Sequence, residues 1–279
     1  MKVLLKAVFA IKKALNKIYS DNVGAYAAQS SFFIIVSIFP FIMLLLTLIQ
    51  YTPITKDFLL KLIADFTPSQ IRNLLFQIID EIYSTQSIAL ISATAIAALW
   101  ASGKGVLAIM QGLNSVFGIT EHRNYIVRRF IASLYTLIFL IAMVFSLVLL
   151  VFGNQLLLFV NSTVPFIGGL IESLIGRKFL IALCFLTLFF MVVYKFIPNR
   201  KTSFVKELPG ALLSALGWQL FSYFYSLYVD YSKGFSTMYG SLGTLIFAML
   251  WMYFCMYIMF FGAEFNTFLE KKLFVNIFR

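Results

Sequence analysis

The chain has 279 residues, of which 61% are hydrophobic and 12% are charged. Typical soluble domains are about 45–50% apolar and about 25% charged, and the mean hydropathy of this chain is +0.93. These values exclude an ordinary cytosolic enzyme, a disordered chain and a small secreted domain held together by disulfides. They indicate a polytopic membrane protein.

The first 20 residues predict an amphipathic helix rather than a cleavable signal peptide, because no compact apolar core precedes a small-residue cleavage site. Apolar residues recur at helical spacing on one side of this helix and lysines gather on the other, namely Leu4, Val8, Ile11, Leu15 and Ile18 against Lys2, Lys6, Lys13 and Lys17. Such a helix lies in the plane of the lipid headgroups or packs on the cytoplasmic surface of the protein itself. The sequence leaves both alternatives open.

Six apolar segments are each long enough to cross a hydrocarbon core about 30 Å thick as a helix of about 20 residues. They cover residues 25–51, 85–103, 130–152, 179–197, 209–229 and 241–263. We therefore predict an all-α fold with six transmembrane helices in one membrane domain over residues 21–270. A basic cytoplasmic tail is expected at residues 271–279.

Between the first two spans, residues 68–83 predict a second amphipathic helix. Thr67 suits the helix cap, Pro68 the first helical position and Gln70 the position three residues after the cap. Isoleucines and leucines then recur at helical spacing, with polar residues on the other faces. We expect this helix to lie on the outer leaflet or to cap the helix bundle.

Lysines and arginines are distributed unequally between the segments that flank the spans. Sixteen of the 22 fall in the N-terminal segment, in 104–129, in 195–207 and in the C-terminal segment, which alternate with the segments that hold the other six. Because cationic segments stay in the cytoplasm, we expect both termini there. This asymmetry accounts for the net charge of +11, so nucleic acid is not needed as a partner.

Ionisable residues are nearly absent from the middle of the spans, but uncharged polar residues occur there. Ser31 and Ser37 in the first span and Gln219, Ser222 and Ser226 in the fifth are candidates for substrate binding. They line a cavity for part of an amphipathic substrate, or they form hydrogen bonds between helices that are worth on average about 0.6 kcal/mol each. The sequence leaves both interpretations open.

The beginning of the sixth span supplies three more candidates for substrate binding. Tyr239, Gly240 and Ser241 stand in a glycine-containing segment at the predicted helix start. Exposed amides at a helix start bind anionic groups such as phosphate. The alternative is a tight loop that enters the helix without any role in binding.

The other end of the sixth span carries charged and polar side chains at the expected cytoplasmic interface. Glu264 and Asn266 lie there, and Arg128 or Arg129 is a candidate partner for the Glu264 carboxylate. The group forms a structural ion pair or takes part in gating. A charge at bilayer depth costs at least about 2.5 kcal/mol, so charged groups at span ends are easier to accommodate.

The sequence offers little for catalysis or for metal binding. It has one histidine, His122, and its two cysteines, Cys184 and Cys255, lie inside apolar runs. A metal centre or an acid–base pair needs several such side chains close together. No glycine-rich phosphate loop with its lysine is present either. We therefore expect no catalytic residues, no metal, no cofactor and no enzymatic activity.

Several short motifs follow one another in order between residues 21 and 266. They cover residues 27–33, 37–40, 99–102, 113–114, 128–129, 209–210, 239–243 and 262–266. In this order and spacing they resemble the YihY / virulence factor BrkB family of bacterial inner-membrane proteins, formerly labelled ribonuclease BN. The resemblance implies six spans with cytoplasmic termini in a bacterial inner or plasma membrane. At Ser31-Phe32-Phe33 the chain departs from a stretch that is often tyrosine-rich in the family.

Members of this family have carried a ribonuclease label or have been linked to envelope integrity, serum resistance or lipid export. Together with the uncharged polar interior, the resemblance favours a transporter or flippase for a lipid or another amphipathic envelope component, with membrane lipids as partners. The alternative is a non-transporting scaffold that binds envelope-biogenesis proteins. RNA cleavage is disfavoured, because it needs an acid–base pair or metal ligands.

Overall fold

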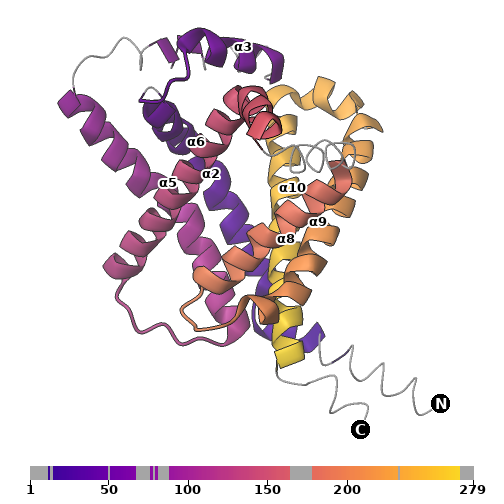
Figure 1. Cartoon of the computed structure of the whole chain (residues 1–279). Coiled ribbons are helices and arrows are strands. Elements are labelled where there is room, and N and C mark those ends of the chain that lie inside the picture. The colour runs from indigo at the N-terminus through magenta and orange to yellow at the C-terminus, as the bar shows by residue number, and fades with distance from the viewer. Residues whose placement is uncertain are drawn as a thin grey trace. The chain divides into compact units, whose positions relative to one another are not determined.

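The computed structural model describes residue 12 and residues 15–49, 51–66, 76–77, 79–80, 88–163, 178–231 and 233–270. In these ranges the regular structure is helical and no strand occurs. The main helices are α2 (Val23–Ile49), α3 (Lys56–Phe66), α5 (Ile88–Phe117), α6 (Tyr125–Thr163), α8 (Lys178–Phe196), α9 (Phe204–Tyr231) and α10 (Lys233–Glu270) (Figure 1). The prediction of an all-α fold is confirmed.

The chain divides into two compact units. Unit 1 consists of Met1–Ile35, Leu107–Asn124 and Arg177–Arg279, and unit 2 consists of Val36–Val106 and Tyr125–Gly176. Helices α2 and α5 each contribute to both units. In unit 1, α9 packs against both α8 and α10, and the three helices run side by side (Figure 1).

Within the described ranges, four helical segments are long and apolar enough to cross a membrane, namely Ala95–Phe117, Tyr125–Phe145, Phe179–Phe196 and Leu245–Glu270. In α2, the segments Val23–Ile38 and Pro40–Ile49 meet at 47° and together would form a fifth. Pro40 accounts for the bend, because its ring clashes with the preceding turn and it has no amide to donate. Several membrane helices are therefore confirmed, and the count of six stays a prediction.

The predicted spans agree with these helices to different degrees. The span predicted at 179–197 coincides with Phe179–Phe196. The span predicted at 85–103 corresponds to α5, which continues past Lys104 because one lysine does not end a helix. The span predicted at 209–229 lies inside α9, which is long enough but falls short in apolarity because Gln219 and several serines and tyrosines lower its hydropathy.

The structure corrects the start of the sixth span. Residues 233–240, which we expected in a loop, belong to α10, so Tyr239, Gly240 and Ser241 lie within a helix and not at its first turn. A glycine inside a helix costs only about 1 kcal/mol relative to alanine, so two glycines in an otherwise helix-forming segment do not end it. The proposed anion site on exposed amides therefore has no helix start at this position.

Three shorter helical segments lie outside the expected spans. Helix α3 was not among the elements expected from the sequence, and its Lys56 Nζ lies 2.7 Å from Asp80 Oδ1. Of the helix predicted at 68–83, residues 76–77 and 79–80 are described and are helical, with Ile79 buried. Residues 15–20 of the predicted N-terminal helix are helical too, and Ile18 is buried in unit 1. The rest of these two helices lies outside the described residues.

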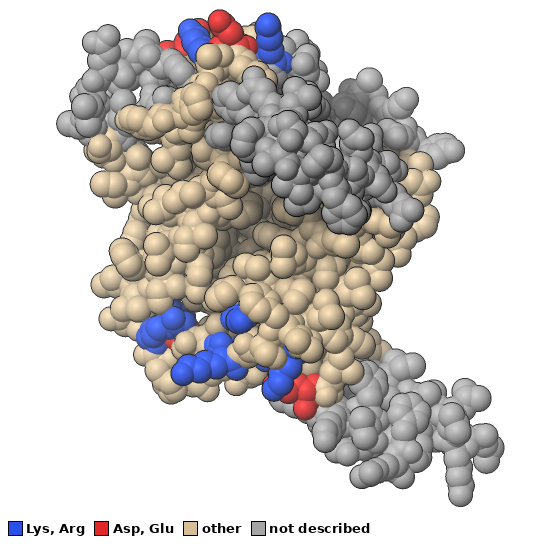
Figure 2. Space-filling view, in the orientation of Figure 1, with Lys and Arg blue, Asp and Glu red and all other residues tan. Residues whose placement is uncertain are grey.

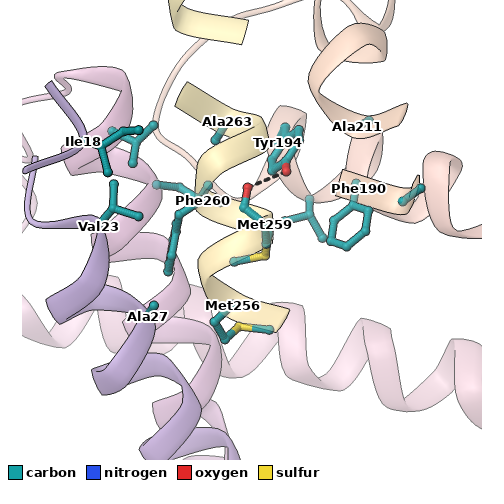
Figure 3. Packing of buried hydrophobic residues seen from close by; sticks show 14 residues of the cluster. Ile18, Val23, Ala27, Phe190, Tyr194, Ala211, Met256, Met259, Phe260 and Ala263 are labelled. Carbon is teal, nitrogen blue, oxygen red and sulfur yellow. Dashed lines mark hydrogen bonds between the residues drawn. The ribbon is translucent and has the colours of Figure 1, made fainter. Parts of the chain in front are cut away.

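The core of unit 1 joins side chains from both ends of the chain. Tyr194 and Phe190 of α8, small residues of α9, and Met256, Met259 and Phe260 of α10 form one cluster with Ile18 (Figure 3). Figure 3 shows Phe260 extending from α10 toward Val23 and Ala27 of α2, with Ile18 nearby. In lipid, such close packing holds helices together without a hydrophobic driving force between them.

The core of unit 2 is aliphatic. It contains Leu44, Leu45, Leu46 and Ile49 of α2, Leu59 of α3, Leu140 of α6, and Ile54 and Ile79.

The described charged side chains gather in groups near helix ends on the face drawn in Figure 2. The described surface between these groups is formed by uncharged residues. This distribution is expected for helices whose flanks contact lipid, because charged groups are expensive at bilayer depth.

Candidate functional site

In unit 1, α9 and α10 approach each other closely at two glycines, Gly210 and Gly262. A Cβ atom on Gly262 would lie 2.6 Å from the Gly210 carbonyl oxygen and 2.8 Å from the Tyr194 hydroxyl oxygen, and closer still to Ser214 Oγ. Gly210 and Ser214 are one turn apart on α9, so the contact is of the small-xxx-small type found between membrane helices. The glycines are needed here because any side chain would push the helices apart.

Hydrogen bonds from α8 and α9 reinforce this contact. The Tyr194 hydroxyl group donates to the Met259 carbonyl oxygen at 2.6 Å (Figure 3) and lies 2.7 Å from Ser214 Oγ. Ser214 Oγ in turn donates to the Ile258 carbonyl oxygen at 3.1 Å. Tyr194 and Ser214 are both fully buried, so three helices are connected by a satisfied polar network.

Asn266 of α10 closes the crossing at one end. Its Oδ1 accepts a hydrogen bond from the Gly210 amide at 2.7 Å, and its Nδ2 donates to the carbonyl oxygen of Glu207 at 3.1 Å and to Glu207 Oε2 at 2.9 Å. Pro209 lies between these two residues inside α9 and has no amide to continue the helical ladder. The Asn266 side chain thus binds the backbone of α9 where the proline weakens it.

Glu207 is buried and also binds the connection between α8 and α9. Its Oε1 accepts hydrogen bonds from Arg200 Nη2 at 2.5 Å and from Thr202 Oγ1 at 2.7 Å. Burial raises the pKa of Glu207, while the hydrogen bonds from Thr202 and Asn266 and the positive charge of Arg200 lower it, and the effect of burial is the larger. Sequence reasoning missed this glutamate, although a carboxylate next to a helix proline was visible.

Arg200 connects three elements. Besides Glu207, its guanidinium binds Glu270 Oε2 of α10 at 3.1 Å and stacks 3.4 Å from the centre of the Phe117 ring of α5. Planar guanidinium groups suit such combined ion pairing and stacking. Arg200 therefore ties the ends of α5, α9 and α10 together. In the sequence, Arg200 is only one of several basic residues in the segment 195–207.

Glu264 pairs with the N-terminal segment, not with the arginines that we considered. Lys17 Nζ lies 2.6 Å from Glu264 Oε2, and it also contacts Asp21 and the Val116 carbonyl oxygen. Glu264 is fully buried, and its Oε1 has no hydrogen-bond partner among the described residues. The lysine of the predicted amphipathic helix therefore has a structural contact, which favours packing of this helix on the protein.

Glu121 organises the connection between α5 and α6. Its carboxylate accepts hydrogen bonds from Arg123 at 2.6 and 2.8 Å and from Asn114 Nδ2 at 3.1 Å, and Asn199 Nδ2 lies 3.5 Å away. The hydrogen bond from Arg123 is the main cause that lowers the pKa of Glu121 to about 2, against burial, which raises it. The carboxylate is thus a structural anion that is ionised at neutral pH.

The predicted polar residues of the spans occupy different environments. Ser31 is buried and its hydroxyl group donates to the Ala28 carbonyl oxygen at 2.9 Å, while Ser37 is buried in unit 2. Ser222 accepts a hydrogen bond from Trp251 Nε1 at 3.3 Å, whereas Ser226 is exposed. The surroundings of Tyr239, Gly240 and Ser241 are outside the described part of the structure.

Gln219 differs from these serines. Its Nε2 atom is buried and has no hydrogen-bond partner among the described residues. Ser30 of α2, which the sequence analysis did not single out for binding, is fully buried with a hydroxyl group in the same condition. With Glu264 Oε1 of α10, three helices of unit 1 thus each carry a buried polar atom without a hydrogen-bond partner among the described residues. Such atoms are costly inside a membrane protein, and packing alone does not explain them.

Arg128 and Arg129 lie in the first turns of α6. Arg129 donates from Nη2 to the Trp100 carbonyl oxygen, and its guanidinium carbon is 5.2 Å from the centre of the Trp100 ring. Both arginines retain buried guanidinium nitrogens without a partner in the described structure. In the described ranges no group of three His, Cys, Asp or Glu side chains could hold a metal ion, and His122 is exposed.

The family model described as virulence factor BrkB matches residues 14–276 of the chain. The chain belongs to this family. The match includes Lys17, Gly210, Gly262, Glu264 and Asn266, so the contacts described above lie within the part that defines the family. The resemblance inferred from short motifs is thereby confirmed, and with it the assignment as a multi-pass membrane protein.

Individual relatives agree with membership of the virulence factor BrkB family. The ribonuclease-like protein YfkH of Bacillus subtilis (strain 168) is 30% identical over 258 residues, which cover 88% of this chain and 90% of the relative. A UPF0761 membrane protein of Pseudoalteromonas atlantica is 21% identical over 96% of this chain and 88% of its own length. One of Idiomarina loihiensis is 31% identical over 83 residues, 30% of this chain and 29% of the relative. No solved structure matches the chain.

Proposed function

We propose that this BrkB-family protein lies in a bacterial inner or plasma membrane with both termini in the cytoplasm. The support is the excess of lysine and arginine in alternate segments. Cysteines introduced singly at Lys12 and at Lys56 test it in a background without Cys184 and Cys255. A membrane-impermeant maleimide added to intact cells should label the second position and spare the first, and the reverse pattern would contradict the orientation.

We further propose that the protein moves a lipid or another amphipathic envelope component across the membrane. The observation that carries this proposal is the pair of buried polar atoms without hydrogen-bond partners in the helices of unit 1, Ser30 Oγ and Gln219 Nε2. Uncompensated polar groups at membrane depth are rare, and they commonly mark the path of a substrate or an ion. In this proposal the polar headgroup of the substrate supplies the missing hydrogen bonds.

Gln219 gives stronger support to the transport proposal than Ser30 does. If its role were only to connect helices, Nε2 would have an acceptor within reach, and none occurs among the described residues. Substitution of an unsatisfied buried amide by an apolar side chain of similar size should leave stability unchanged or raise it. A loss of transport without a loss of stability would therefore assign Gln219 to the substrate.

The experiment uses the full chain reconstituted in lipid vesicles that carry a fluorescent phospholipid in both leaflets. A reductant added outside destroys the accessible label, and continued loss of signal reports movement of lipid from the inner leaflet. Wild-type protein should accelerate this loss, and Gln219→Leu should slow it while the thermal midpoint is maintained. Leu220→Ala is the matched control, because Leu220 is adjacent on α9 and 54% exposed.

The second candidate is the non-transporting scaffold, and the saturated contacts of Asn266 favour it. Gly210, Glu207 and Asn266 satisfy one another within the protein, as expected for a fixed helix crossing. A scaffold should yield a reproducible protein partner on chemical crosslinking in cells, and Gln219→Leu should leave its cellular role intact. Transport by purified protein in vesicles would decide against the scaffold as the sole function.

We do not propose a ribonuclease function, although the relative YfkH is named ribonuclease-like. The chain contains a single histidine, His122, and hydrolysis of RNA requires a positioned acid–base pair or metal ligands. Purified protein should therefore leave a labelled RNA intact. Cleavage that is abolished by His122→Ala would contradict this view.

A further inference from the structure

Arg129 is among the largest fully buried side chains of the described structure, with 1% of its surface exposed. It belongs to unit 2, as does Trp100, the residue that it contacts. One of its five N–H donors reaches the Trp100 carbonyl oxygen, and the guanidinium lies over the Trp100 ring. These contacts orient the charged group but do not neutralise it.

Two guanidinium nitrogens of Arg129, Nε and Nη1, are buried and lack a hydrogen-bond partner, and none of the ion pairs found among the described residues involves Arg129. The arginine side chain does not become neutral by losing a proton, because its pKa is too high. A buried charge without a counter-ion is among the most destabilising features that a protein can contain. The physical expectation is an anion that comes from outside the chain.

The surroundings of Arg129 offer further donors. Arg128 has a buried Nε without a partner, and Ser133, one turn along α6 from Arg129, has a buried hydroxyl group in the same condition. Ser133 packs tightly against α5, since a Cβ atom on Gly103 would lie 2.9 Å from Ser133 Oγ. Residues four apart share one helix face, so Arg129 and Ser133 present unsatisfied donors on the face that contacts α5.

We propose that Arg129, with Arg128 and Ser133, binds the phosphate group of a membrane phospholipid. A guanidinium fork matches phosphate oxygens with two parallel hydrogen bonds, and phosphate is the anion that a bilayer supplies at the level of its headgroups. The large apolar side chains Ile126 and Phe130 are exposed on the same turns of α6 and are available to acyl chains. The stacked Trp100 is 47% exposed, so the guanidinium of Arg129 lies next to a side chain that reaches the surface.

This site is independent of the proposed transport function. It is built from residues of unit 2, whereas the proposed substrate contacts belong to unit 1. A phospholipid held by Arg129 would stay bound to the protein whether or not other lipids move. Binding measurements on the purified protein therefore test the phosphate site, and vesicle assays test transport, so failure of one does not imply failure of the other.

Native mass spectrometry of the full-length protein, with phosphatidylglycerol or diacylglycerol added in equal amounts, tests the site. Wild-type protein should retain phosphatidylglycerol and not diacylglycerol, which lacks the phosphate. Arg129→Gln should weaken retention of phosphatidylglycerol about tenfold or more, the effect of losing a charge-assisted bidentate contact. Equal retention by Arg129→Gln and wild type would overturn the proposal.

Lys56→Gln is the matched control, because it removes one positive charge from unit 2 in an exposed ion pair and should retain the lipid as wild type does. Inorganic phosphate alone is a second arm, and protection against heat equal to that by phosphatidylglycerol would identify free phosphate and refute the lipid as ligand. If Arg129→Gln is not monodisperse, Arg129→Lys decides: retention should fall because lysine lacks the fork, and unchanged retention would overturn the proposal.

Discussion

Gly262→Ala should destabilise the protein, whereas the same substitution at Gly24 should not. Both glycines lie in helices of unit 1. Helix propensity favours alanine more strongly at Gly262, inside α10, than at Gly24, in the first turn of α2, so propensity cannot be the cause of a loss confined to Gly262→Ala. A Cβ atom on Gly24 would meet the Tyr253 hydroxyl oxygen at 3.6 Å, an ordinary contact, but one on Gly262 would lie 2.6 Å from the backbone carbonyl oxygen of Gly210. Backbone cannot rotate away, so α9 and α10 must separate.

The size of the expected destabilisation by Gly262→Ala follows from the contacts that the added methyl group disturbs. Overpacking of a tight core costs about 1–3 kcal/mol, and separation of the helices weakens two or more hydrogen bonds of the crossing at about 0.6 kcal/mol each. Loss of the flexible glycine from the unfolded chain returns about 0.4–1 kcal/mol at both positions. We therefore expect Gly262→Ala to lower the free energy of unfolding by about 1.5–3.5 kcal/mol and Gly24→Ala to leave it unchanged or slightly raised.

Thermal unfolding of the purified variants in one detergent, followed by tryptophan fluorescence at a fixed heating rate, measures the difference. The midpoint of Gly262→Ala should fall by roughly 5–10 °C, and that of Gly24→Ala should stay within about 2 °C of wild type. Equal shifts in the two variants would refute the close approach of α9 and α10 at Gly262.

Three further outcomes follow from the polar contacts of unit 1. Asn266→Ala leaves the Gly210 amide without its acceptor and should lower the unfolding free energy by about 2–4 kcal/mol, measured in the same thermal assay; an unchanged midpoint would contradict it. The pKa of Glu121 falls from its ordinary value of 4.5 to about 2 in the folded protein. The ionised carboxylate therefore stabilises the folded protein above about pH 4.5, and this contribution is lost as the pH falls toward 2. Glu121→Gln should make the unfolding free energy depend less on pH in this range, and identical pH profiles of variant and wild type would contradict the assignment. Lys17→Gln strands the buried Glu264 carboxylate and should cost up to about 3 kcal/mol; adding Glu264→Gln should recover part of it, and a double variant no better than the single one would count against the pair.

The helical content and several membrane segments could be predicted because apolar length is a local property of the sequence. The segment at 179–197 shows this best, since its run of apolar residues ends at Lys195, Pro198 and Arg200. Helix α3 was missed because it is short and its charged residues resemble a loop. The start of α10 was misplaced because glycine was given too much weight as a helix breaker, although its cost is only about 1 kcal/mol.

The residues of the candidate site could be located in the sequence only in part. Asn266, Glu264 and Arg129 stand out as polar residues near span ends, and the structure shows a contact for each of them. Their roles in binding or gating stay predictions. Their partners could not be predicted, because the contact between Lys17 and Glu264 joins residues 247 positions apart. Interhelical partners depend on packing in three dimensions, whereas sequence patterns report on one helix at a time.

The most direct test of the proposed transport is the fraction of labelled phospholipid that an external reductant reaches in vesicles containing the purified protein. Vesicles without protein should lose about half of the signal, since only the outer leaflet is accessible. Wild-type protein should bring the loss close to completion, and Gln219→Leu should return it toward the protein-free value at an unchanged thermal midpoint. Loss confined to the outer leaflet with correctly folded wild-type protein would contradict the proposal.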